Sequence, residues 1–248
     1  MMRGSCLCGG VVFDVLGHSR PVIACHCTQC RKQSGHFWAA SAVSQDALTL
    51  VKADTLAWYA ASDSAKRGFC NGCGAFLFWQ AMESDQISFA PGAIDGPTGL
   101  QIAEHWYEDD AGDYYHGQPT TAEVLYGSCL CGANRFTLSG PMGEVWGCHC
   151  HQCRKTSGHY SASFDAPTSM IEWHARRTRD HVGPNGGVRS FCPTCGSGLL
   201  FRSASEQSVE AGVIDNPTAG RLVRHIHVSS KGDYYELTDG LPQSPSGE

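Results

Sequence analysis

The hydrophobic residues of this chain fall in short runs separated by small polar residues, which is the pattern of β-strands. Runs of three to five residues, rich in β-branched and aromatic side chains and bounded by Gly, Ser or Asp, occur at 11–15, 76–79, 87–90 and 199–201. No stretch shows a sustained apolar period of about 3.6 residues with helix caps. We therefore expect a mainly β protein, with at most a short helical turn after Cys30 or Cys153.

The pattern occurs twice along the chain. Each half has seven cysteines in the same order, with an offset of 123 residues for the first five pairs and 122 for the last two. The 248 residues are thus expected to form a first domain at 1–117, a linker at 118–125, a second domain at 126–240 and a flexible tail at 241–248. Seven is an odd number, so internal disulfides cannot use every cysteine of a unit, and metal binding is the simpler explanation.

Composition narrows the class of protein. A hydrophobic share of 42% and a charged share of 17% are typical of a globular chain. The net charge of −6 argues against bulk attraction to nucleic acid or anionic lipid. The first residues lack an apolar signal core, and no apolar run approaches the roughly 20 residues that span a membrane. With this many thiols, we expect a reducing cytoplasm.

Four cysteines of each unit are scattered, as a C-x-C near its start and a C-x-x-C further on. A C-x-C on an extended segment places both sulfurs on one face, and a C-x-x-C turn followed by glycine brings two more together. Two such pairs supply four thiolates to a tetrahedral zinc of the structural type. The expected ligands are Cys6, Cys8, Cys70 and Cys73 in the first unit and Cys129, Cys131, Cys192 and Cys195 in the second.

The other three cysteines of each unit form a compact triplet with the spacing C-x-C-x-x-C. The two triplets are Cys25, Cys27 and Cys30 in the first unit and Cys148, Cys150 and Cys153 in the second. Three protein ligands with one open position are the arrangement of a catalytic zinc. In an extended Cys-His-Cys segment, His26 or His149 points away from the sulfurs, so we expect each histidine to orient or cover the site.

Other groupings and other cofactors remain open at this stage. Cys6 and Cys8 could join the triplet, which would leave Cys70 and Cys73 short of partners. An iron–sulfur cluster also takes four cysteines, although ferredoxin-type runs differ from C-x-C-x-x-C. A redox C-x-x-C would leave the C-x-C pairs without a role. These comparisons favour zinc.

The motifs resemble those of the glutathione-dependent formaldehyde-activating enzyme (GFA) family, whose domain is shared with centromere protein V. The resemblance rests on 4–9, 25–35, 69–74 and 95–97, all of which recur in the second half. The second unit adds His225-Ile226-His227 near its end, where the first unit departs with His105-Trp106-Tyr107. The resemblance implies two tandem β-tent domains, each with a structural zinc at the four-cysteine group and a more labile zinc at the triplet.

The family's reaction joins glutathione and formaldehyde into S-hydroxymethylglutathione, formally a carbon–sulfur lyase reaction in reverse. The resemblance implies that both triplets are catalytic and that glutathione or a similar thiol enters the open position. Four basic residues directly follow the third cysteines, namely Arg31, Lys32, Arg154 and Lys155. They could attract the carboxylates of such a thiol, or they could be ordinary solvated charges.

A non-catalytic zinc module that binds a protein partner is the alternative function. The absence of a basic tail and of overall basic charge disfavours nucleic acid as that partner. Under the enzyme hypothesis the partners are a small thiol and an aldehyde, with no membrane. The duplication leads us to expect a pseudo-dimer of the two units. The repeated pairs Tyr114-Tyr115 and Tyr234-Tyr235 either bridge the units or cover the sites.

Overall fold

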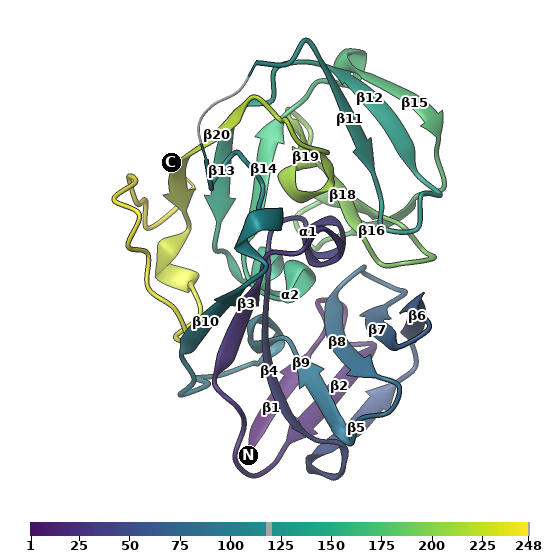
Figure 1. Cartoon of the computed structure of the whole chain (residues 1–248), viewed down its shortest axis with the longest axis vertical. Coiled ribbons are helices and arrows are strands. Elements are labelled where there is room, and N and C mark those ends of the chain that lie inside the picture. Colours follow the sequence, from purple (N-terminus) through teal and green to yellow (C-terminus); the bar gives the residue numbers. More distant parts are fainter. Residues whose placement is uncertain (118–120, 248) are drawn as a thin grey trace.

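The computed structural model describes residues 1–117 and 121–247, and it is mainly β (Figure 1). In the first unit, one sheet has the order β1-β2-β5 and a larger sheet has the order β10-β3-β4-β9-β8-β7-β6. The strands are β1 Met2–Ser5, β2 Val11–Val15, β3 Val22–Cys25, β4 Trp38–Ser44, β5 Leu48–Ala53, β6 Leu56–Ser62, β7 Ala65–Cys70, β8 Phe76–Ala81, β9 Gln86–Phe89 and β10 Ile102–Trp106.

The second unit repeats this topology strand by strand. Its sheets have the orders β11-β12-β15 and β16-β17-β18-β19-β14-β13-β20, so each strand matches the one numbered ten lower. The strands are β11 Val124–Ser128, β12 Arg135–Ser139, β13 Gly143–Cys148, β14 Ser161–Asp165, β15 Ile171–Ala175, β16 Arg179–Val182, β17 Val188–Phe191, β18 Gly198–Arg202, β19 Gln207–Glu210 and β20 Gly220–Ile226. The repetition confirms the prediction of two tandem, mainly β domains.

The strands follow the alternation that the sequence predicts. In β2, Val11, Phe13 and Val15 are buried, while the two residues between them are partly exposed. Such alternation places one face of a strand in the core and the other toward solvent. The run predicted at 11–15 is β2, and the other three predicted runs overlap β8, β9 and β18.

A short helix begins directly after the second cysteine of each triplet and contains the third: α1 Thr28–Ser34 or α2 His151–Ser157. Each is longer than the single turn predicted after Cys30 or Cys153. Both helices end at a glycine in the left-handed region, Gly35 with φ 86° and Gly158 with φ 81°. A side chain at that φ would be strained, so glycine is the natural residue to stop the helix there. The 3-10 turns are η1 Gln45–Ala47, η2 Pro91–Ala93, η3 Glu108–Asp110, η4 Thr168–Met170, η5 Ala211–Val213 and η6 Val228–Ser230.

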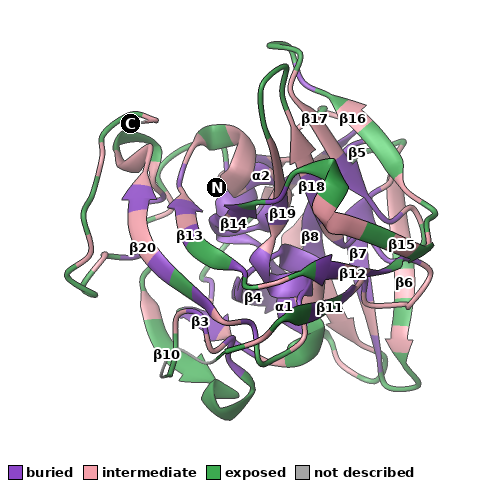
Figure 2. Cartoon of the chain, turned by 90° about the horizontal axis from the view of Figure 1, so that it is seen from above, coloured by how far each residue is buried: buried purple, intermediate pink, exposed green. Residues whose placement is uncertain are grey.

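The two helices lie at the centre of the molecule, between the sheets of the two units, and α1 is mostly buried (Figures 1 and 2). Helix α1 packs against η5 and β18 of the second unit, and α2 packs against η2 and β8 of the first. Gly212 N donates to Gly35 O at 2.7 Å, and Gly92 N donates to Gly158 O at 3.1 Å. The two units therefore exchange equivalent contacts.

The boundaries of the units differ in detail from those expected. Strand β11 begins at Val124, inside the segment predicted as a linker, and residues 118–120 of that linker lie outside the described residues. The tail was expected to be free, yet its backbone pairs with β20 as far as Ser246. His225 N donates to Pro242 O, and Ser244 N donates to His225 O, each at 2.8 Å. The tail thus lies along the end of β20, which on its other side pairs with β13, the strand that ends at Cys148.

Among the described residues, none of the helices has the length and apolar character needed to cross a membrane.

Candidate functional site

The sulfurs of each scattered four-cysteine group lie together. Cys6 and Cys8 come from the turn between β1 and β2, and Cys70 and Cys73 surround the turn after β7. All four Sγ atoms lie within 4.8 Å of one another. The second unit forms the equivalent group from Cys129, Cys131, Cys192 and Cys195. Cys6 and Cys8 therefore belong with the C-x-x-C turn and not with the triplet.

The spacing of these sulfurs fits a tetrahedral metal ion. The Sγ atom of Cys8 lies 3.6 Å from that of Cys6 and 3.5 Å from that of Cys70. Four sulfurs at about 2.3 Å from one zinc would be about 3.8 Å apart, whereas a disulfide needs about 2.05 Å. The backbone N–H of Val11 donates to Cys6 Sγ at 3.2 Å, as suits a thiolate. The donor set is thus suited to a thiophilic divalent metal.

The triplets have only three sulfurs each. Cys25 ends β3, Cys27 directly precedes α1, and Cys30 lies in its first turn. The equivalent positions in the second unit are Cys148, Cys150 and Cys153. Within residues 1–117 and 121–247, no histidine, cysteine, aspartate or glutamate atom joins either triplet as a fourth member within 4.8 Å. Each triplet could hold a metal ion and leave one position to an outside ligand.

The middle cysteine of each triplet is prepared to be a thiolate. Hydrogen bonds with Cys25 and Cys30 lower the pKa of the Cys27 thiol to about 2. In the second unit, the corresponding hydrogen bonds with Cys148 and Cys153 lower the pKa of Cys150 to about 2. The pKa values of the other two thiols of each triplet are raised by hydrogen bonds with the neighbouring cysteines and by burial, so those thiols would lose their protons only to a bound cation.

An arginine that our sequence reasoning missed lies against the third cysteine of each triplet. The guanidinium of Arg67, on β7, lies 3.6 Å from Cys30 Sγ, and that of Arg189, on β17, lies 3.8 Å from Cys153 Sγ. Three thiolates and a divalent ion carry a net charge of −1, which one guanidinium offsets. The signal in the sequence is the repeated Arg-x-Phe-Cys at 67–70 and 189–192.

The histidines inside the triplets bond to other side chains rather than to the sulfurs. Nδ1 of His26 lies 2.8 Å from the Tyr115 hydroxyl, and its Nε2 lies 2.9 Å from His105 Nδ1. His149 bonds in the same way to Tyr235, at 2.6 Å, and to His225, at 2.9 Å. Both ring nitrogens are occupied in each case, in line with a covering role.

The paired tyrosines bond to the histidines of the triplets and bridge the units. Tyr115 and Tyr235 hold the triplet histidines, as described above. The backbone of their neighbours crosses between units: Leu222 N donates to Tyr114 O at 2.7 Å, and Ile102 N donates to Tyr234 O at 2.9 Å. Of the two roles that the sequence left open, these contacts show the bridging of the units, and covering of the sites stays a prediction.

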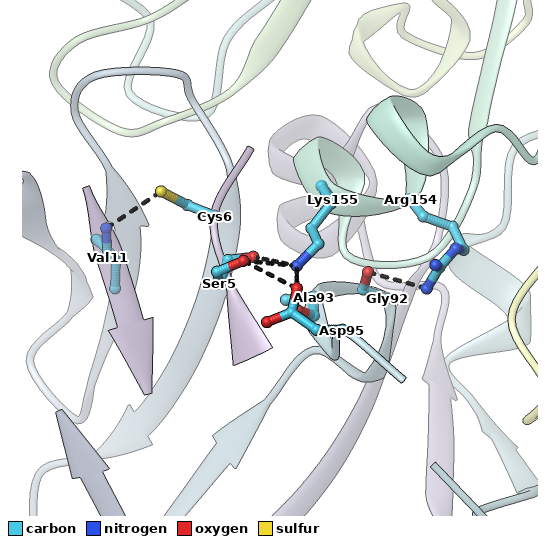
Figure 3. A network of polar contacts seen from close by, with 8 residues as sticks. All are labelled: Ser5, Cys6, Val11, Gly92, Ala93, Asp95, Arg154 and Lys155. Atoms are coloured by element: carbon cyan, nitrogen blue, oxygen red, sulfur yellow. Dashed lines mark hydrogen bonds and ion pairs between the residues drawn. The ribbon is translucent and has the colours of Figure 1, made fainter. Parts of the chain in front are cut away.

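The basic residues after the triplets reach across to the other unit (Figure 3). Lys155 Nζ donates to Ser5 O, Ser5 Oγ and Ala93 O at 2.7–2.9 Å and forms an ion pair with Asp95. Lys32 Nζ lies 2.8 Å from Asp215 and 2.5 Å from Ser128 Oγ.

The two arginines make similar contacts. Nη1 of Arg31 lies 3.5 Å from Gly212 O and 3.4 Å from Ile214 O, and Nη1 of Arg154 lies 3.3 Å from Gly92 O. Lys155 is only 2% exposed and Arg31 only 3%. Their binding of a thiol's carboxylates stays a prediction, and the contacts observed favour a role in joining the units.

The fold and these sites define a class: a duplicated β protein in which each unit has one group of four sulfurs and one of three, both suited to metal. A profile of the family described as "Glutathione-dependent formaldehyde-activating enzyme" matches residues 1–110 and 124–230. The chain therefore belongs to the GFA family and contains two copies of its domain.

Two individual proteins are similar to parts of this chain. A Halomonas elongata protein named "Putative glutathione-dependent formaldehyde-activating enzyme" is 36% identical over 127 residues, which cover 46% of this chain and 81% of that protein. A crystal structure of a Rhodobacter sphaeroides protein is similar at 24% identity, with a TM-score of 0.35, over 42% of this chain and 99% of that one.

Proposed function

We propose that the chain is a zinc enzyme that joins a thiol to a small aldehyde, as in the formation of S-hydroxymethylglutathione from glutathione and formaldehyde. The observation that carries this proposal is the unequal division of the sulfurs, four in one group and three in the other. A closed four-sulfur site braces a fold, while a three-sulfur site accepts an outside ligand. The family description and the name of the Halomonas relative support the choice of thiol and aldehyde.

The reaction that this site supports balances without any other reactant. When zinc is bound at a triplet, it supplies a position at which a thiol loses its proton near neutral pH. The thiol sulfur forms a bond to the aldehyde carbon, the carbon–oxygen double bond becomes single, and the oxygen gains the proton. The reverse reaction is that of a carbon–sulfur lyase. The rate acceleration would come from activation of the thiol as a nucleophile and from holding it close to the aldehyde.

The protein's own side chains would act around this step. Arg67 and Arg189 hold the third cysteines and reduce the negative charge of the triplets. His26 and His149 keep their ring nitrogens engaged, so they leave the open position to the substrate. The buried surroundings strengthen electrostatic interactions at the site.

We also propose that the units act as one pseudo-dimeric body in a reducing cytoplasm. The reciprocal contacts of α1 and α2 with the opposite units support the first part. The second rests on 14 thiols, which an oxidising compartment would put at risk of disulfide formation.

Metal content and adduct exchange test the function together. At full loading we expect two zinc ions per unit, and Cys27→Ser and Cys150→Ser should each lose one ion and stay folded. Exchange between ¹³C-formaldehyde and its glutathione adduct, followed by NMR, should exceed the uncatalysed rate with wild type and fall to it in the double variant. Met82→Ser, at an exposed position, serves as the control. If the variants lose zinc as expected but wild type does not accelerate the exchange, the result would instead favour a non-catalytic module that binds a protein partner.

A further inference from the structure

The second unit contains a continuous line of hydrogen bonds that passes through the histidine of its triplet and ends at Tyr235. Asp239 Oδ2 lies 2.7 Å from Nε2 of His225, and Nδ1 of His225 lies 2.9 Å from Nε2 of His149. Nδ1 of His149 in turn lies 2.6 Å from the hydroxyl of Tyr235. His225 and His149 are fully buried, and His149 stands between the first two cysteines of the triplet.

The carboxylate at one end sets the direction of every bond in this line. Burial raises the pKa of Asp239, but hydrogen bonds from His225 and Leu241 outweigh it and leave the pKa below its usual value. A carboxylate only accepts, so Nε2 of His225 has the proton. A neutral imidazole has one N–H, so Nδ1 of His225 accepts from His149 Nε2–H, and Nδ1 of His149 accepts from the Tyr235 hydroxyl.

The Tyr235 hydroxyl therefore directs its proton toward His149 and keeps acceptor capacity on its oxygen. Burial raises the pKa of Tyr235, and the nearby Cys148 thiol adds to this, so the phenol stays protonated. An oxygen in this state can accept a hydrogen bond from an O–H group beside the triplet. It offers no proton to a bare carbonyl oxygen.

Among the described residues of the first unit, no carboxylate is hydrogen-bonded to His105, which stands where the second unit has His225. His26 bonds to Tyr115 and His105 with the same atoms, but His105 is exposed on β10. Counted from the paired tyrosines, the position of Asp239 corresponds to Pro119, which has no carboxylate and lies outside the described residues. Water beside His105 can donate or accept, so neither direction is imposed.

We propose that Asp239 is a positioning residue of the second site, where it sets the tautomers of His225 and His149 and so holds Tyr235 as a hydrogen-bond acceptor. This inference rests on the proposed function and adds the form of ligand that the site prefers. That form is the hydroxymethyl thioether, whose hydroxyl can donate to Tyr235, rather than the free aldehyde. The two triplets of the chain are thereby unequal.

Asp239→Asn tests the direction of the line without removing the turn that Asp239 also supports. The oxygen of the new amide can still accept from Leu241 N, now at 3.1 Å from Asp239 Oδ1. Its nitrogen then takes the place of Oδ2 and donates to His225, which reverses both histidine tautomers. Long-range ¹H–¹⁵N NMR at pH 8 should show the Nε2–H form of His225 and His149 in wild type and the Nδ1–H form in the variant.

Activity through the second triplet is the other readout, measured in a Cys27→Ser background that disables the first. Asp239→Asn should lower kcat for adduct cleavage at least tenfold, in the range of a misplaced proton-handling group. Tyr235→Phe should do the same, and Asp165→Asn, an exposed aspartate of the same unit, should not.

The outcomes separate this inference from the function on which it rests. A charged His225 in wild type, or tautomers that Asp239→Asn leaves unchanged, would overturn the assignment of direction whatever the activity. Reversed tautomers with unchanged kcat would overturn the positioning role. Absence of turnover in wild type as well would overturn the proposed function and the role together, while leaving the tautomer result as a property of the fold.

Discussion

Lys155 offers a direct test of how strongly the two units hold each other. Its ammonium group has four acceptors in the first unit: Ser5 O, Ser5 Oγ, Ala93 O and the carboxylate of Asp95 (Figure 3). Lys155→Met keeps most of the side-chain volume and removes the charge. Lys32→Met is the matched control, because Lys32 occupies the equivalent position in the first unit.

The two variants should differ in cost because the groups that they leave behind differ. Asp95 is 41% exposed and regains water when Lys155 is lost, so it adds little to the cost. The carbonyl oxygens of Ser5 and Ala93 lose their donor at the interface, at about 1–3 kcal/mol each, which suggests about 3 kcal/mol in all. Lys32 contacts a carboxylate that is 48% exposed and one hydroxyl, and we expect about 1 kcal/mol there.

Thermal unfolding at fixed zinc concentration measures the difference. For a chain of this size, about 1 kcal/mol shifts Tm by about 2–4 °C, so Lys155→Met should lower Tm by about 6–12 °C and Lys32→Met by about 2–4 °C. Zinc content is measured alongside, so that loss of metal is not mistaken for loss of the contact. Equal Tm shifts for the two variants would show that the Ser5 and Ala93 carbonyls do not account for the cost of losing Lys155.

Two further predictions concern the same interface. Burial raises the pKa of Glu210 to about 7, so its stabilising contribution is complete below pH 4.5 and is lost as the pH rises through about 7. Glu210→Gln keeps an acceptor for Ser161 and cannot ionise. Its free energy of unfolding, measured in urea, should therefore exceed that of wild type by up to about 2 kcal/mol at pH 8. A difference between variant and wild type that does not change with pH would contradict this. A Cβ on Gly212 would lie 2.4 Å from Arg31 O, so Gly212→Ala should cost about 1–3 kcal/mol, whereas Gly96→Ala, with open space around it, should be nearly neutral. Equal unfolding free energies for these two glycine variants would rule out close backbone approach as the reason for glycine in η5.

The sequence predicts the sulfur groups well because metal ligands are chemically irreplaceable and recur at constant spacing. The β class also follows from local signals, since Val11, Phe13 and Val15 alternate with more polar positions. The sequence favoured the C-x-x-C turn as the partner of each C-x-C but left the triplet as an alternative, and the structure brings the favoured set of sulfurs together.

The contacts that sequence reasoning missed act across strands or across units. Arg67 lies 37 positions from Cys30, and only the folding of β7 brings them together. Lys155 reads as a solvated lysine at the end of a short helix, because nothing local shows that the first unit covers it. The tail looks free for the same reason: its partner, β20, is recognised only once the sheet exists.

The duplication explains why the contacts are reciprocal while the surroundings of the two triplets differ. In a homodimer, every change would appear twice at the interface, whereas a tandem chain can vary one half at a time. Around the cap glycines, the second unit has the hydrogen-bonded polar pair Ser161 and Glu210 where the first has the apolar pair Trp38 and Ala90. In the sequence, the second unit likewise has Asp239 where the first has Pro119. Helices α1 and α2 each pack against the opposite unit, so each unit supports the helix of the other's triplet. We therefore expect that one triplet can acquire different neighbouring residues without loss of the fold. The hydrogen-bonded line from Asp239 to Tyr235 is such a difference.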